Sequence, residues 1–134
     1  RGLDTRHGLG VEPFNVLSEE LPLEGVDVVI PLAAYVGPKC EQTPFLAKGL
    51  NQRAAESLAK RLDGRRCIYL TTDSGYPAGD MAHESGPFEP KSVYARTKAA
   101  GASALFDAGA TVFRLASLFP VTCMVARRSP SCGR

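Results

Sequence analysis

The sequence predicts an α/β fold in which helices flank a parallel sheet. Two apolar stretches, Gly25 to Ala34 and Arg66 to Thr72, have the nearly continuous hydrophobicity of strands that are covered on both faces. A helical repeat lies between them, and a second helical stretch and a third strand follow. Strand, helix, strand, helix, strand is the order of a right-handed α/β sheet.

The predicted elements after the first strand have clear local signals. Thr43 and Pro44 form an N-cap and first-turn pair for a helix that closes at Gly64. Its apolar residues recur every four positions: Leu46, Leu50, Ala54, Leu58 and Leu62. The second strand is followed by a long loop at 73–91, and a loop at a strand end is often functional. A second helix over 93–106 and a third strand over 111–119 complete the pattern.

Length and charge narrow the class of protein. The chain has 134 residues, enough for one domain, and its 44% hydrophobic content is ordinary for a globular protein. Residues 121–134 contain three arginines and no acid, which leaves 13 bases and 14 acids in residues 1–120. Such a balance gives no electrostatic footprint for nucleic acid or an anionic membrane. We expect one domain over 1–120, a poorly packed tail over 121–134, and neither nucleic-acid nor membrane partners.

The cysteines do not have the spacing of a metal site. There are four, Cys40, Cys67, Cys123 and Cys132, with no C-x-x-C pair and only two histidines to assist them, so we expect no metal. Cys67 lies in an apolar strand pattern, where a free buried thiol fits a reducing, cytoplasmic location. The longest apolar run, at 28–36, is too short to cross a bilayer.

Three residues suggest acid/base chemistry. Tyr94 and Lys98 stand four residues apart and therefore on one face of the second helix, and Thr72 ends a strand where α/β sheets bind ligands. A phenol has a pKa near 10, so a tyrosine base needs a shift of about 3 units, which a neighbouring ammonium partly supplies. Thr72 would hold a substrate hydroxyl or carbonyl beside the phenol. Each residue alone also fits an ordinary helix-surface or strand-end position.

Five ordered segments resemble the extended short-chain dehydrogenase/reductases, the NAD-dependent epimerase/dehydratase family. "YARTK" resembles Y-x-x-[ST]-K, "DVVIPLAA" resembles D-x-V-[IV]-H-L-A-A, and Asn51 matches an asparagine of the next helix. "TTDSGYP" resembles S-[ST]-x-x-V-Y-G, and "FRLASLFP" resembles R-x-x-N-V-Y-G-P. The likeness covers roughly residues 25–120. Within the family, nucleotide-sugar epimerases and dTDP-4-dehydrorhamnose reductases are the most similar subgroups.

The resemblance implies a fold, a cofactor and a substrate class. The fold would be a partial Rossmann-like, doubly wound sheet that binds NAD or NADP. The substrate would be a nucleotide sugar, changed by epimerisation, dehydration or reduction. The full-length protein would be cytoplasmic and could form a homodimer. The alternative is a non-catalytic member of the same fold, either nucleotide-sensing or degenerate.

The resemblance also assigns residues. It implies that Tyr94 is the acid/base, that Lys98 is the partner of the phenol and of the nicotinamide ribose, and that Thr72 polarises the substrate. The implied cofactor-binding residues are Leu32, Ala33, Ala34, Asn51, Leu70, Tyr94, Lys98, Leu115, Ala116 and Ser117. Four positions depart from the family pattern, namely Pro31, Gly75, Pro77 and Ser117.

The glycine-rich turn G-x-x-G-x-x-G, on which members of the family hold the pyrophosphate, has no match in these residues. Gly8 and Gly10 form a G-x-G, but we expect no strand before them, and Pro13 occupies the third glycine position. We therefore expect an internal piece of an enzyme or a truncated gene product. Alone, it should be inactive and should not bind NAD(P) measurably.

Overall fold

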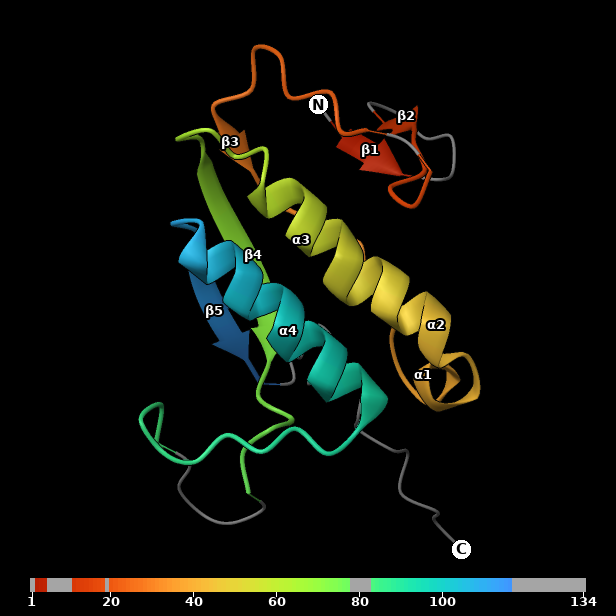
Figure 1. Cartoon of the computed structure of the whole chain (residues 1–134), viewed down its shortest axis with the longest axis vertical. Helices are drawn as coiled ribbons and strands as arrows, with labels where there is room; N and C mark the ends of the chain where they lie inside the picture. Colours follow the sequence, from red (N-terminus) through yellow and green to blue (C-terminus); the bar gives the residue numbers. More distant parts are fainter. Residues whose placement is uncertain (1, 5–10, 19, 78–82, 117–134) are drawn as a thin grey trace, which may run out of the picture.

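The computed structural model describes residues 2–4, 11–18, 20–77 and 83–116 (Figure 1). Its main sheet has three parallel strands in the order β3, β4, β5. These strands are β3 (Val28–Val29), β4 (Arg66–Thr72) and β5 (Thr111–Leu115). Because helices connect β3 to β4 and β4 to β5, the predicted α/β fold is confirmed.

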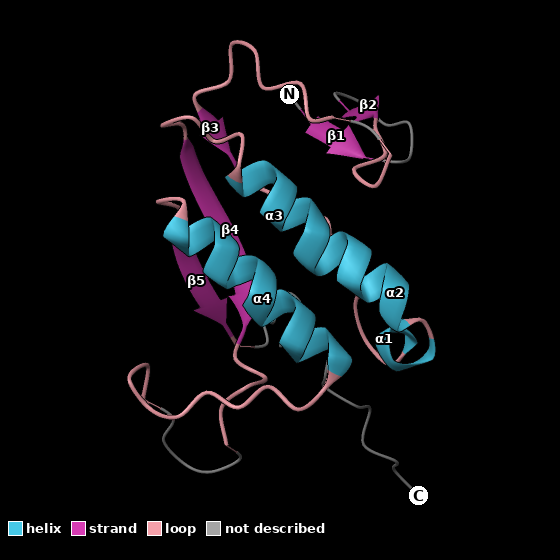
Figure 2. Ribbon diagram, in the orientation of Figure 1, coloured by secondary structure: helices cyan, strands magenta, loops and turns pink. Residues whose placement is uncertain are grey.

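The helices between β3 and β4 form one nearly continuous rod after a short first turn (Figure 2). They are α1 (Lys39–Gln42), α2 (Pro44–Ala47), the π-helical η1 (Lys48–Arg53) and α3 (Ala54–Ala59). The predicted start at Pro44 is confirmed, but the predicted end at Gly64 is wrong. The last helical residue is Ala59, and the N–H of Arg61 bonds the Leu58 carbonyl three residues back over 2.9 Å, as in a tightened last turn. Asp63 and Gly64, with φ angles of 44° and 74°, then form the left-handed turn that precedes β4.

The first predicted strand is shorter and more exposed than expected. Only Val28 and Val29 of the stretch 25–34 pair with β4. The prediction that this strand is covered on both faces is wrong, since Val28 is 40% exposed and Ile30 is 52% exposed. The reason is visible in Figure 1, where α3 and α4 (Val93–Asp107) both lie on the same face of the sheet. The third predicted strand is found over 111–115, and residues 117–119 lie outside the described residues.

A second, two-stranded parallel sheet contains β1 (Gly2–Asp4) and β2 (Val11–Pro13). The expectation that no strand precedes Gly8 is therefore wrong. Each strand has only three residues, which is too short for an alternating pattern to be recognised in the sequence. Among the helices of the described residues, none is long and apolar enough to cross a membrane.

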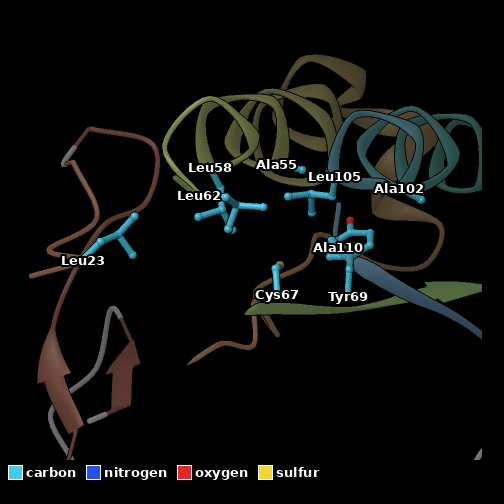
Figure 3. Close-up of a cluster of buried hydrophobic side chains, with 9 residues drawn as sticks. All are labelled: Leu23, Ala55, Leu58, Leu62, Cys67, Tyr69, Ala102, Leu105 and Ala110. Atoms are coloured by element: carbon cyan, nitrogen blue, oxygen red, sulfur yellow. The ribbon is translucent and has the colours of Figure 1, made fainter. Parts of the chain in front are cut away.

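The hydrophobic core lies between the helices and the sheet (Figure 3). Its buried members are Leu23, Ala55, Leu58, Leu62, Cys67, Tyr69, Ala102, Leu105 and Ala110. Gly101 allows α4 to approach η1 closely, because a Cβ atom there would lie 2.2 Å from the carbonyl oxygen of Asn51. Cys67 is a free, buried thiol as predicted, and so is Cys40, whereas Cys123 and Cys132 lie outside the described residues.

The first turn of α4 is fixed by its N-cap. Ser92 has extended backbone angles, and its side-chain oxygen accepts a hydrogen bond of 3.0 Å from the backbone N–H of Ala95. This cap determines where the helix begins after the long loop. It therefore sets the position of Tyr94 and Lys98, which follow within the first two turns.

Candidate functional site

A cavity of about 420 Å³ lies at the carboxyl ends of the main-sheet strands, beside the start of α4. Parallel α/β sheets bind ligands at this edge. Its lining residues are Pro31, Leu32, Ala34, Leu70, Thr71, Thr72, Asp73, Ser74, Tyr94, Lys98, Leu115 and Ala116. The three residues expected to do acid/base chemistry thus line one cavity: Tyr94 and Lys98 from α4, and Thr72 from the end of β4.

The structure groups the other predicted site residues unequally. Leu32, Ala34, Leu70, Leu115 and Ala116 line the cavity with the three residues named above. Ala33 and Asn51 are not among its lining residues, and Ser117 lies outside the described residues.

Thr71 lines the cavity beside Thr72, as expected for the end of this strand. Asp73 and Ser74 also line the cavity but were not predicted to belong to the site. Their position within two residues of Thr72 was the available signal. Side chains alternate between the two faces of a sheet only within a strand. The direction of a side chain beyond the strand end therefore cannot be predicted from this pattern.

Lys98 is buried and is not the solvated charge that a lysine on a helix usually is. Its side chain is 5% exposed, and its Nζ donates a hydrogen bond of 2.9 Å to the hydroxyl of Tyr69 on β4. The same nitrogen lies 4.1 Å from the centroid of the Tyr69 ring. Burial lowers the pKa of Lys98 to about 8, because the charged form loses contact with water.

Tyr94 does not have the lowered pKa expected from its spacing to Lys98. Burial raises the pKa of the Tyr94 phenol, and the negative charges of Cys40 and Asp73, where they form, raise it further. The Lys98 amino group donates instead to Tyr69. Tyr94 therefore keeps its proton at neutral pH.

Thr72 forms a hydroxyl pair with Ser74. The two side-chain oxygens lie 2.7 Å apart, and the backbone N–H of Ser74 donates to the Thr72 oxygen over 3.1 Å. This is the local turn by which a threonine hydroxyl binds the backbone two residues later. It holds the Thr72 hydroxyl in one orientation at the wall of the cavity.

Asn51 is a structural junction rather than part of the cavity wall. It is 1% exposed, its side chain accepts from the backbone N–H of Tyr35 over 2.8 Å, and it donates to the Tyr35 carbonyl over 2.9 Å. It also donates to the hydroxyl of Thr97 on α4 over 3.1 Å. Asn51 thus joins the segment after β3, which includes Leu32 and Ala34, to the helix that bears Tyr94 and Lys98.

The loop after β4 is held against β5 by an aromatic cluster. Arg114 on β5 donates a hydrogen bond of 2.6 Å to the Tyr76 hydroxyl, and its guanidinium lies 4.7 Å from the Phe88 ring centroid. The two rings pack edge to face at 5.1 Å. Phe88 also explains the departure at Gly75, because a Cβ atom at that position would lie 2.3 Å from the Phe88 ring.

The burial of Lys98 predicts how stability depends on pH. The unfolded chain keeps the lysine proton up to a pKa near 10.5, whereas the folded chain releases it near 8. Between these values the unfolded state binds more protons, so the contribution of Lys98 to stability rises with pH. We expect Lys98→Met to raise the free energy of unfolding at neutral pH by about 2 kcal/mol, which is less than the full linkage value because the variant also loses the hydrogen bond between Lys98 and Tyr69.

Urea denaturation followed by circular dichroism, at several pH values from 7 to 10.5, measures this difference between Lys98→Met and the unaltered chain. The advantage of the methionine variant should be largest below pH 8 and should shrink toward pH 10.5. The buried thiols and phenols occur in both chains, so their titration cancels. Lys60→Met, at an exposed helix end, is the matched control. A pH-independent difference would contradict the burial of a charged amine at position 98.

The RmlD substrate binding domain family matches residues 7–123, which is most of the chain. The chain belongs to this family. The dTDP-4-dehydrorhamnose reductase of Salmonella typhimurium is 36% identical over 86 residues, which cover 60% of this chain and 29% of that protein. The predicted relationship to nucleotide-sugar reductases and epimerases is therefore confirmed at the level of the family.

Solved structures of similar fold include a reductase and a nucleotide-sugar complex. A dTDP-4-dehydrorhamnose reductase from Clostridium acetobutylicum has a TM-score of 0.70 and 24% identity, over 83% of this chain and 46% of that one. MoeE5 in complex with UDP-glucose and NAD has a TM-score of 0.69 and 21% identity, over 82% of this chain and 42% of that one. The RmlD-family chain thus spans less than half the length of these structures, and the likeness confirms a Rossmann-like fold.

Proposed function

We propose that this RmlD-family chain provides the acid/base groups of an NAD(P)-dependent reductase whose substrate is the keto form of a nucleotide sugar. The observation that supports this most is the convergence of Tyr94, Lys98 and Thr72 on one cavity of about 420 Å³ at the carboxyl edge of the sheet. The Salmonella relative is a reductase of this kind by name. Epimerisation and dehydration are also reactions of the wider family, but a Tyr94 phenol that keeps its proton favours reduction over them.

The protonation state of Tyr94 supports reduction over oxidation. A phenol with a raised pKa retains its proton at neutral pH and can donate it, whereas a base would have to lose it first. In the proposed reaction the Tyr94 hydroxyl gives its proton to the carbonyl oxygen of the sugar as the carbonyl carbon accepts a hydride. The phenolate that remains is then reprotonated from water.

Thr72 and Lys98 would stabilise the charge that develops during this step. The Thr72 hydroxyl is held at the cavity wall by Ser74 and can donate a hydrogen bond to the same carbonyl oxygen. Lys98 retains a positive charge at neutral pH, because its pKa of about 8 lies above 7. Fixed donors and charges aimed at a developing oxyanion lower the barrier more than flexible groups in water.

The residues that line the cavity would suit a nicotinamide cofactor. Leu32, Ala34 and Leu70 offer a small, apolar wall for a flat ring, and Lys98 offers a donor for a ribose hydroxyl. When bound, NADH or NADPH would supply the hydride. A dTDP-4-dehydrorhamnose reductase of Bacillus anthracis is in complex with NADP, and MoeE5 is in complex with NAD.

A segment exchange tests the proposal. In a chimera, the segment of the Salmonella reductase that corresponds to residues 25–116 of this chain is replaced by these residues. We expect the chimera to oxidise NADPH in the presence of dTDP-4-dehydrorhamnose, with the unmodified Salmonella enzyme as the reference. The 134-residue chain alone, which has no glycine-rich turn, should show no micromolar NADPH binding by calorimetry.

Two outcomes would contradict the proposal or part of it. A chimera that folds and binds NADPH but reduces no nucleotide keto-sugar would favour the non-catalytic alternative. Micromolar NADPH binding by the 134-residue chain would show that the cofactor does not depend on a glycine-rich turn here.

A further inference from the structure

Tyr69 is a buried polar side chain at the edge of the site that the proposed chemistry does not use. It is 3% exposed and lies on the helix side of β4, and in Figure 3 its oxygen points toward the helices. Its hydroxyl accepts the 2.9 Å hydrogen bond from Lys98 and lies 3.4 Å from the carbonyl oxygen of Asn51, to which it donates. Its ring lies 4.1 Å from the same Lys98 nitrogen.

These contacts determine which way the Tyr69 hydroxyl is oriented. A carbonyl oxygen can only accept, so the Tyr69 proton points toward Asn51. The lone pairs of the Tyr69 oxygen are then directed away from Asn51 and are free to accept from the Lys98 amino group. A tyrosine without the carbonyl could turn its proton toward Lys98 and repel it.

The Asn51 carbonyl reaches Tyr69 because of two local features. Asn51 lies in the π-helical turn η1, where a backbone N–H bonds the carbonyl five residues earlier instead of four. Such turns often occur at functional sites. Gly101 on α4 leaves room for the same carbonyl, since a Cβ atom would lie 2.2 Å from it. The arrangement at Lys98 thus depends on residues from a strand and two helices.

We propose that Tyr69 is the positioning residue of Lys98: its hydroxyl and ring face hold the ammonium at the cavity wall beside Tyr94 and Thr72. The role in catalysis rests on the proposed function, because it concerns the proposed charge-stabilising group. Without Tyr69 the flexible lysine side chain would have other rotamers available and would lose an acceptor for its charged form. Tyr69 itself would not touch the substrate.

Several titratable groups lie near Tyr69 and Lys98, and their charges affect the pKa values of the phenols in this region. Tyr94 from α4 and Cys67 from β4 act on Tyr69, and burial together with these two raises the pKa of Tyr69 to about 12. Asp73, after β4, and Cys40 of α1 act on Tyr94. Tyr69 is therefore neutral at every pH at which Lys98 titrates, so it serves Lys98 as a neutral acceptor.

Competitive labelling of the 134-residue chain with trace acetic anhydride tests the proposal without any activity assay. Only the neutral amine reacts, so the pH dependence of Lys98 acetylation, read by mass spectrometry of its peptide, gives its titration midpoint. Exposed Lys39, Lys48 and Lys60 serve as internal standards. The unaltered chain should give a midpoint near 8 for Lys98.

Tyr69→Phe keeps the ring and removes only the acceptor oxygen. A hydrogen bond to a charged group favours the charged form, so its loss should lower the Lys98 midpoint by about one pH unit. Tyr35→Phe is the matched control, because the Tyr35 hydroxyl lies 2.8 Å from Thr43 and does not contact Lys98.

Each other result counts against the proposal. An unchanged Lys98 midpoint in Tyr69→Phe, or equal shifts in Tyr69→Phe and Tyr35→Phe, would overturn it. An unfolded Tyr69→Phe chain, recognised by circular dichroism, would assign the hydroxyl to stability and also overturn it. A chimera without reductase activity, together with the expected midpoint shift, would instead refute the proposed function and leave the positioning of Lys98 standing.

Discussion

Replacing Tyr94 by phenylalanine in the Salmonella chimera should lower kcat by about 10²–10⁴-fold, the range typical of a positioned proton donor. The substitution removes one oxygen from the cavity wall and leaves the ring in place. The carbonyl oxygen would then have to take its proton from water, while the hydride donor remains bound. Steady-state kinetics of NADPH oxidation with dTDP-4-dehydrorhamnose measures this, and NADPH binding by calorimetry should change little.

The matched control for this experiment is Tyr35→Phe. It makes the same chemical change at a phenol that faces Thr43 and does not line the cavity. We expect nearly unaltered kcat for this control. A Tyr94→Phe chimera that retains activity near that of the control would remove Tyr94 from the mechanism, and Thr72 would then become the first candidate for the proton donor.

Gly101→Ala should lower the free energy of unfolding of the 134-residue chain by about 1–3 kcal/mol, despite the higher helix propensity of alanine. The added Cβ atom would lie 2.2 Å from the Asn51 carbonyl oxygen and 3.0 Å from the Ala55 Cβ. A backbone oxygen cannot rotate away as a side chain can, so α4 has to move away from η1. Urea denaturation followed by circular dichroism measures the loss.

Gly49→Ala is the control for this prediction. Gly49 lies in η1, the helix that Gly101 faces from α4, but the new Cβ atom would contact only the Leu17 Cδ2 atom at 3.2 Å, at the flexible end of a side chain. We expect this change to be nearly neutral or slightly stabilising. Equal stability of Gly101→Ala and the unaltered chain would show that the contact between α4 and η1 is not close-packed.

Much of the fold was predictable because its signals are local. The strand at 66–72 and the helix that begins at Val93 were both predicted within one or two residues of their observed bounds. The pair Thr43–Pro44 correctly indicated the start of the long helix. The strand at 25–34 was overestimated, because its apolar residues predict burial, whereas the described helices cover only one face of the sheet.

Asn51 shows which contacts the sequence could not predict. The resemblance matched it to an asparagine expected at the cofactor, and the structure adds that its side chain binds the Tyr35 backbone and Thr97. Its amide is satisfied by groups that lie 16 and 46 residues away in the chain. No helical or strand periodicity relates such positions, so no pattern could have indicated this set of contacts.

The sequence by itself determined the α/β order of elements and the common helical face of Tyr94 and Lys98, because 3.6-residue periodicity and the rules for parallel crossovers follow from local chain geometry. Only the tertiary structure decided that Lys98 binds Tyr69, 29 residues away, and that Tyr94 keeps its proton. The reason is physical: a pKa depends on burial and on charges brought together by folding, and neither is a property of spacing along the chain.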